Sequence, residues 1–280
     1  MYTEHAPLAE LSQRVACVWT HQRAHDSKRP PLIVPDGCTD ILWTGSELRV
    51  AGPDTRPFVE AGAPLMSVVG VRFCCGVGGG VLGAPLTALC DARVALRDLW
   101  GDDAARLHDA LQGQTAVAAL ALLQQAVLSR RHTWRPVDPV VAALVSALGR
   151  EPCDPDLRTT RIARTLGLSE RQLQRRCVSA VGYAPKLLAR IVRMQRFRDA
   201  LRRTPERPLS QLAFELGFAD QAHLGHESAR LFGTSPSQLR AALRGRAAPA
   251  RVSDFDKTPS APLCQAERHE RPHLFGPAAR

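Results

Sequence analysis

The 280-residue sequence predicts an α+β fold. It comprises a β-rich N-terminal domain with following helices, and a C-terminal all-α domain of two helix-turn-helix units joined by a long helix. Three observations support this prediction. Short β-branched and aromatic runs occur only in the first half, a leucine and glycine pattern occurs twice in the second half, and the excess positive charge lies with that repeat.

These observations divide the chain into four parts. Residues 1–131 form the predicted β-rich domain, and residues 132–136 form a linker in which Arg135-Pro136 disfavours a continuous helix. Residues 137–246 form the predicted helical domain. The tail at 247–280 is rich in proline, alanine and charge without periodicity, so we expect it to be disordered.

Five short runs near the N-terminus predict strands. They combine β-branched or aromatic residues with turn-forming neighbours, and they span residues 15–19, 31–35, 40–43, 48–50 and 67–73. The sequence Pro35-Asp36-Gly37 predicts a turn between two of them. From Pro85 onward the apolar spacing becomes helical, and the run from Thr115 to Arg131 predicts a helix that is buried or shared between subunits.

The repeat in the second half predicts two short helices around a tight turn, twice. In each copy, apolar residues four apart precede a glycine suited to the left-handed conformation that ends a helix, and Ser169 or Asp220 is placed to cap the next helix. The copies lie 50 or 51 residues apart. The matching residues are Ile162, Leu166, Gly167, Leu173, Gly182 and Pro185 in the first copy, and Leu212, Leu216, Gly217, Leu224, Gly233 and Pro236 in the second.

The segment between the two copies predicts a long helix. Pro185 suits a first helical turn, and an apolar stripe continues to about residue 201. A helix of about 16 residues is roughly 24 Å long, which suits two units that contact successive grooves of a duplex.

The charge distribution indicates a polyanionic partner for the helical domain. Lys and Arg against Asp and Glu number 14 and 14 in residues 1–150, 18 and 9 in residues 151–246, and 5 and 4 in residues 247–280, which together give the net charge of +10. A basic helical module beside a neutral domain is typical of proteins that bind a phosphate backbone. Ordinary helical hairpins with a solvated basic face remain the alternative.

Residues 137–244 resemble the DNA-binding domain of AraC-type (AraC/XylS) transcriptional regulators. The closest motifs are Gly217–Leu224 and Phe232–Pro236. The N-terminal segment resembles a poorly characterised domain found with some of these regulators, on the basis of Pro35–Trp43 and Gly70–Phe73. The resemblance implies a sequence-specific DNA-binding transcriptional regulator with two recognition helices in successive major grooves, modulated through its N-terminal domain.

The resemblance also implies which side chains contact DNA. The base-reading positions are Arg171, Gln174 and Arg175 in the first unit, and Gln221, His223 and His226 in the second. Arginine and glutamine suit direct readout of guanine and adenine, although a phosphate contact or simple solvation is the alternative for each position. Phosphate contacts are expected from Ser169, Arg176, Lys186, Arg190 and Arg193.

The second unit departs from the family pattern at three positions, one of which is His226, where a longer basic side chain is common. Ser228 places a hydroxyl where a buried aromatic is usual, and Gly225 lies inside the recognition helix, where glycine costs about 1 kcal/mol relative to alanine. We therefore expect the second unit to be less rigid than the first and to read DNA less strictly.

Catalytic chemistry has little support in the sequence. Gly78–Gly83 matches a dinucleotide-binding pattern, but no second parallel strand with a terminal acidic residue follows, so a flexible loop is the preferred interpretation. Asp36 and Asp40 are interpreted as turn and strand-start residues rather than a catalytic pair. We expect no enzymatic activity and no catalytic residues. The alternatives are a DNA-alkylation repair-type enzyme carrying an AraC-type domain, and an architectural DNA binder without an effector.

The expected partner is double-stranded DNA. A small-molecule effector, contact with RNA polymerase and homodimer formation stay open. The eight cysteines contain no C-x-x-C spacing, so we expect neither a metal site nor a cofactor. The sequence has no signal peptide and no long apolar run, which predicts no membrane association and a cytoplasmic location.

Overall fold

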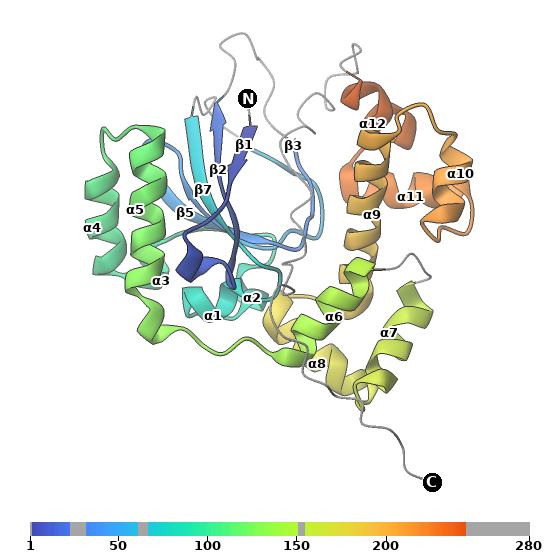
Figure 1. The fold of residues 1–280 in the computed structure, drawn as a ribbon, viewed down its shortest axis with the longest axis horizontal. Helices are drawn as coiled ribbons and strands as arrows, with labels where there is room; N and C mark the ends of the chain where they lie inside the picture. Colours follow the sequence, from blue (N-terminus) through green and yellow to red (C-terminus); the bar gives the residue numbers. More distant parts are fainter. Residues whose placement is uncertain (1, 23–31, 61–66, 151–154, 245–280) are drawn as a thin grey trace.

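A six-stranded antiparallel sheet forms the centre of the N-terminal part (Figure 1). The structure is a computed structural model that describes residues 2–22, 32–60, 67–150 and 155–244. A separate two-stranded sheet pairs β3 (Leu32–Ile33) with β6 (Phe58–Val59). In pairing order, the strands of the main sheet are β1 (Tyr2–His5), β2 (Val15–Gln22), β7 (Ser67–Phe73), β4 (Thr39–Trp43), β5 (Leu48–Ala51) and β8 (Arg93–Ala95).

The five predicted strands correspond to β2, β3, β4, β5 and β7. The turn at Pro35–Gly37 is also present, because Gly37 has a φ of 83° and the Asp36 carboxylate accepts a hydrogen bond from the Cys38 amide at 2.9 Å. The prediction missed β1, β6 and β8. Of these, β1 and β8 lie at the two edges of the main sheet.

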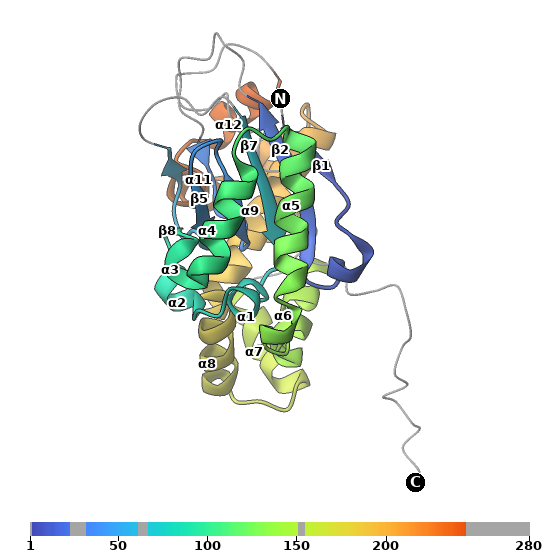
Figure 2. The same cartoon turned by 90° about the vertical axis from the view of Figure 1, so that its left-hand side faces the viewer.

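Helices cover one face of the main sheet. α4 (Asp102–Leu111) and α5 (Ala116–Ser129) lie side by side on it, as both views show (Figures 1 and 2). Leu120 and Leu123 of α5 belong to the same apolar cluster as Ile41 and Val71 of the sheet. The helix expected to be buried or shared between subunits is therefore buried against its own sheet.

Short helical segments connect the sheet to the rest of the chain. They are η1 (Ala9–Leu11), α1 (Gly78–Leu82), α2 (Leu86–Leu89), α3 (Arg97–Trp100) and η2 (Arg131–Thr133). The expectation of a flexible loop at Gly78–Gly83 is wrong, because these glycines begin α1. Close packing explains the glycines: a Cβ at Gly78 would lie 2.8 Å from Thr39, and one at Gly79 would lie 2.8 Å from the Ala84 carbonyl.

The described C-terminal part is all-helical and contains two helix-turn-helix units joined by a long helix, as predicted. The helices of this part are α6 (Pro139–Arg150), α7 (Pro155–Thr165), α8 (Glu170–Val181), α9 (Pro185–Arg203), α10 (Leu209–Glu215), α11 (Gln221–Phe232) and α12 (Pro236–Leu243). The joining helix α9 has 19 residues and is about 28 Å long, slightly longer than expected. The predicted disordered tail lies outside the described residues.

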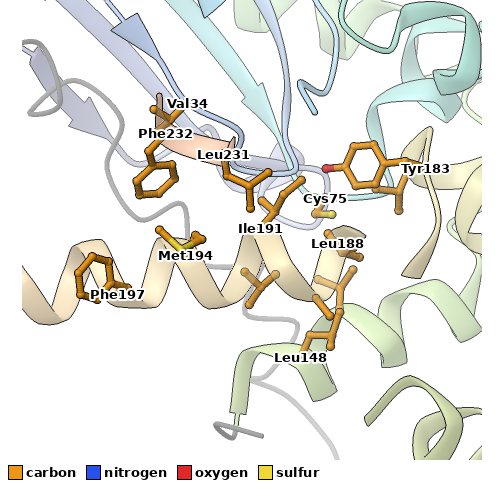
Figure 3. Packing of buried hydrophobic residues seen from close by; sticks show 14 of the residues in the cluster. Val34, Cys75, Leu148, Tyr183, Leu188, Ile191, Met194, Phe197, Leu231 and Phe232 are labelled. Carbon is orange, nitrogen blue, oxygen red and sulfur yellow. The ribbon is translucent and has the colours of Figure 1, made fainter. Parts of the chain in front are cut away.

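The two parts of the chain share an apolar core. Val34 and Cys75 of the N-terminal part belong to one cluster with Tyr183, Leu188 and Ile191 of the C-terminal part (Figure 3). Residues 132–136, the predicted linker, contact the N-terminal part in this structure. The Arg135 amide donates to the Gly80 carbonyl at 3.1 Å, which holds this segment against α1.

Candidate nucleic-acid interface

Both recognition helices begin at the predicted caps. The Ser169 hydroxyl accepts a hydrogen bond from the Gln172 amide, and the Gln172 side chain accepts one from the Ser169 amide, which forms a capping box at the start of α8. The Asp220 carboxylate accepts a hydrogen bond from the His223 amide at 2.7 Å at the start of α11. Gly182 and Gly233 end these helices in the left-handed conformation, with φ of 96° and 66°.

The three base-reading candidates of the first unit lie together on an exposed face of α8. Arg171, Gln174 and Arg175 are exposed, whereas Leu173 and Cys177 on the opposite face are buried in the core. An open surface groove is lined by Ser169, Arg171, Gln172, Gln174, Arg175 and Val178. α8 therefore presents two guanidinium groups and one amide from a helix that is anchored on its other side.

The second unit has fewer base-reading candidates with free side chains than the first unit. Gln221 and His226 are exposed on α11. His223 is half-buried, and its Nδ1 accepts a hydrogen bond from the Ala219 amide at 3.2 Å while its ring lies edge-on to Phe218. His223 therefore helps to hold the turn before α11, which limits its freedom to contact a base.

The structure corrects the expectation that Ser228 weakens the second unit. Ser228 is fully buried, and its hydroxyl donates to the Thr234 carbonyl at 2.7 Å. In the first unit, the Cys177 thiol makes the equivalent contact with the Tyr183 carbonyl at 3.3 Å. The hydroxyl is satisfied and links α11 to the segment before α12, so it does not loosen the helix.

Two arginines expected at phosphates instead make internal contacts in this structure. The Arg190 guanidinium donates to both Glu227 carboxylate oxygens, at 2.7 and 2.6 Å. Arg193 is only 6% exposed, donates to the Gly217 carbonyl at 2.7 Å and lies over the Phe218 ring. These contacts join α9 to the second unit and count against phosphate contacts, especially for Arg193.

Glu227 is a structural residue that the sequence analysis missed. It lies within a basic segment on α11 and contributes the carboxylate that pairs with α9. Burial favours its neutral form, but the hydrogen bonds and positive charge of Arg190, with further help from Arg193, lower its pKa.

The other three phosphate candidates differ in their surroundings. Ser169 and Lys186 are exposed, at the start of α8 and in the first turn of α9. The Arg176 guanidinium donates to both oxygens of Asp138, at 3.1 and 3.2 Å. Asp138 also accepts from the Val140 amide at 2.9 Å, so Arg176 connects α8 to the beginning of α6.

Asp36 and Asp40 surround a buried arginine. The Arg72 Nε donates to Asp40 at 3.0 Å, and its Nη2 lies 3.5 Å from Asp36. Asp40 also accepts from the Trp19 indole at 2.9 Å. Burial raises the pKa of Asp40, although the positive charge of Arg72 opposes this shift. The arrangement is an ion-pair network on the sheet face opposite α5.

The described residues contain neither a candidate metal site nor a candidate membrane-spanning helix. No group of three or more histidine, cysteine, aspartate or glutamate side chains is arranged to hold a metal ion among them. Within the same part of the chain, no helix combines the length and apolar character needed to cross a membrane.

Arg14 and Arg135 were also missed by the sequence analysis. Both line a cavity that reaches Arg175 and Arg176 of α8. Arg14 is far from α8 in sequence, and no local motif marks either residue. Only the packing of the N-terminal part against α8 brings them together.

Comparison with protein families gives two matches. Residues 162–242 match a family described as a helix-turn-helix domain, and residues 3–95 match a domain of unknown function (DUF6597). A comparison with curated proteins finds no match.

Among solved structures, ToxT from Vibrio cholerae is similar at 10% identity, with 85% of this chain and 97% of that chain covered and a TM-score of 0.41. A second structure of ToxT, from Vibrio cholerae O395, is similar at 11% identity, with coverage of 81% and 97% and a TM-score of 0.40.

Proposed function

We propose that this chain is an AraC-type transcriptional regulator that recognises a specific DNA site, because residues 162–242 match a helix-turn-helix domain family and residues 3–95 match a domain of unknown function on its N-terminal side. α8 and α11 enter successive major grooves of a specific duplex site, and the N-terminal domain modulates this binding. The exposed row of Arg171, Gln174 and Arg175 on α8 supports the proposal most strongly, because these side chains can read base edges from an anchored helix.

Base discrimination is concentrated in the half-site that faces α8. α11 presents Gln221 and His226, but its other exposed positions include the small residues Ala222 and Ala229. The proposed role of α11 is therefore mainly to add affinity for the DNA backbone. The length of α9, about 28 Å, is compatible with units spaced by about one helical turn of DNA.

The N-terminal domain is positioned to influence α8. α2 packs against α8, and Arg176 of α8 is bonded to Asp138 in the segment that leads from the N-terminal part. The Gln195 side chain of α9 also donates to the Pro35 carbonyl. We place the division between the sensory or oligomerising domain and the DNA-binding domain at residues 132–136, with residues 137–246 forming the latter.

Selection of bound sites from a random duplex library tests the proposal, followed by affinity measurements on the selected site. Replacing Arg171 with alanine is expected to cost roughly 1–3 kcal/mol on that site and to relax preference at one base pair. Arg97→Ala, at an exposed position on α3, serves as a control without effect. An equal loss on selected and random DNA would instead assign Arg171 to a phosphate, and absence of any selected site would contradict sequence-specific binding.

A further inference from the structure

A cavity of about 410 Å³ lies between the N-terminal part, the segment 135–138 and α8. Its volume is within the range of small-ligand sites. Four arginines from three separate segments line it, together with one carboxylate. The arginines are Arg14, Arg135, Arg175 and Arg176, and the carboxylate is Asp138.

The Asp138 carboxylate already accepts hydrogen bonds from other groups of the protein. Asp138 accepts hydrogen bonds from Arg176 and from the Val140 amide at the beginning of α6. Arg135 and Arg175 form no ion pair within the part of the chain that the structure describes. Within these described residues, Arg14, Arg135 and Arg175 therefore border one space without a carboxylate partner, and an anion bound there would reduce the repulsion between their positive charges.

Contacts with the backbone and an aromatic ring hold the Arg14 side chain and the backbone of Arg135 in place. Arg14 lies over the Trp134 ring and donates to the Arg135 carbonyl at 3.1 Å. The Arg135 amide is bonded to the Gly80 carbonyl. A Cβ at Gly80 would lie 3.3 Å from the Arg135 carbonyl oxygen, so the glycine run of α1 allows this close approach. Burial lowers the pKa of the Arg14 guanidinium, and a bound anion would offset that cost.

We propose that this cavity binds an oxyanion, held jointly by arginines of the N-terminal part and of the recognition helix. Planar guanidinium groups bind phosphate and carboxylate oxygens in pairs. The oxyanion is either a backbone phosphate of bound DNA or the phosphate or carboxylate of a free small ligand. Arg175 also lines the outer groove of α8, which connects the cavity to the proposed DNA-reading face. The proposal rests on the proposed function only in the case where DNA supplies the phosphate.

The test uses the full chain with Arg135→Gln and Arg135→Glu. Arg135 is exposed, and its side chain makes no ion pair with another described residue, so these variants are expected to fold. Arg131→Gln is the matched control, because Arg131 is an exposed arginine four residues earlier that does not line the cavity. One measurement is a titration with inorganic phosphate, in which calorimetry detects binding. The other is the salt dependence of affinity for DNA.

The two measurements distinguish the sources. If DNA supplies the phosphate, Arg135→Gln lowers the slope of log affinity against log salt concentration by about one, and Arg131→Gln does not. If the ligand is small, the slope is unchanged, but saturable phosphate binding by the wild type is lost in both Arg135 variants and kept in Arg131→Gln. An unchanged slope without such phosphate binding overturns the proposal. If the wild type binds no DNA, the proposed function fails, while the phosphate titration still decides the cavity.

Discussion

Ser228 illustrates how the effect of one buried polar atom depends on its partner. Its hydroxyl bonds to the Thr234 carbonyl in a fully buried position. We expect Ser228→Ala to destabilise the chain by about 1–3 kcal/mol, because the carbonyl loses its partner. Urea unfolding followed by circular dichroism measures this loss.

Ser228→Cys provides the comparison, because Cys177 makes the equivalent bond in the first unit. The cysteine variant should retain more stability than the alanine variant. Equal stability of Ser228→Ala and the wild type would show that this hydrogen bond contributes nothing, and would restore the view of Ser228 as a packing defect.

The ion pair between Glu227 and Arg190 predicts a dependence of stability on pH. Because the pKa of Glu227 is lowered in the folded chain, its contribution is present above the unfolded pKa of about 4.3 and is lost as the pH falls through the folded pKa. We expect Glu227→Gln to cost roughly 1–3 kcal/mol at neutral pH. The difference between variant and wild type should shrink below about pH 4. A difference independent of pH between 7 and 3 would argue against the ion pair.

The recognition helix α11 contains a glycine that nothing in the structure requires. Within the part of the chain that the structure describes, no neighbouring atom lies within 4 Å of a Cβ added at Gly225. Gly225→Ala should therefore raise the stability of the chain by about 1 kcal/mol, the usual difference between the two residues inside a helix. Thermal unfolding measures the gain, and Ala229→Gly, at an exposed position of the same helix, should produce a loss of similar size. A loss of stability in Gly225→Ala would contradict the open space at this position.

The elements that local patterns determine were predicted well from the sequence. Caps, helix-ending glycines and apolar periodicity are properties of neighbouring residues, and they correctly indicated α8, α9 and α11. The edge strands β1 and β8 were missed because they are short and are defined by pairing with distant strands. Gly78–Gly80 was misinterpreted because the packing of α1 against Thr39 and Ala84 is invisible to a local pattern.

The candidate site also depends on contacts between residues far apart in the sequence, which local patterns do not reveal. The sequence indicated the positions of Arg171 and Arg175, and the structure places them on an exposed face of α8. Their roles as base readers stay predictions. Arg14 and Arg135 could not be associated with α8 from the sequence, because only the tertiary fold places them around one cavity.

The shared core predicts that the two parts of the chain unfold together. Val34 and Cys75 pack in one cluster with Leu188 and Ile191, so unfolding of either part exposes apolar surface of the other. Cooperative units are expected to follow such contacts rather than boundaries drawn from composition. The four tryptophans all lie at or before Trp134, whereas the C-terminal part is entirely helical. Tryptophan fluorescence therefore reports the N-terminal part, whereas helical circular dichroism is weighted toward the C-terminal part.

Urea unfolding of the full chain should give the same midpoint by tryptophan fluorescence, which reports the N-terminal part, and by helical circular dichroism, to which the C-terminal helices contribute strongly. Val34→Asp should lower both midpoints together, because it would place an unpaired charge inside the apolar core that the two parts share. Val117→Asp is the control, since Val117 is 79% exposed on α5 and its replacement should shift neither midpoint appreciably. Two separate transitions in the wild type would mean that the contacts in the shared core are too weak to couple the parts, and control of α8 by the N-terminal domain would then require another route.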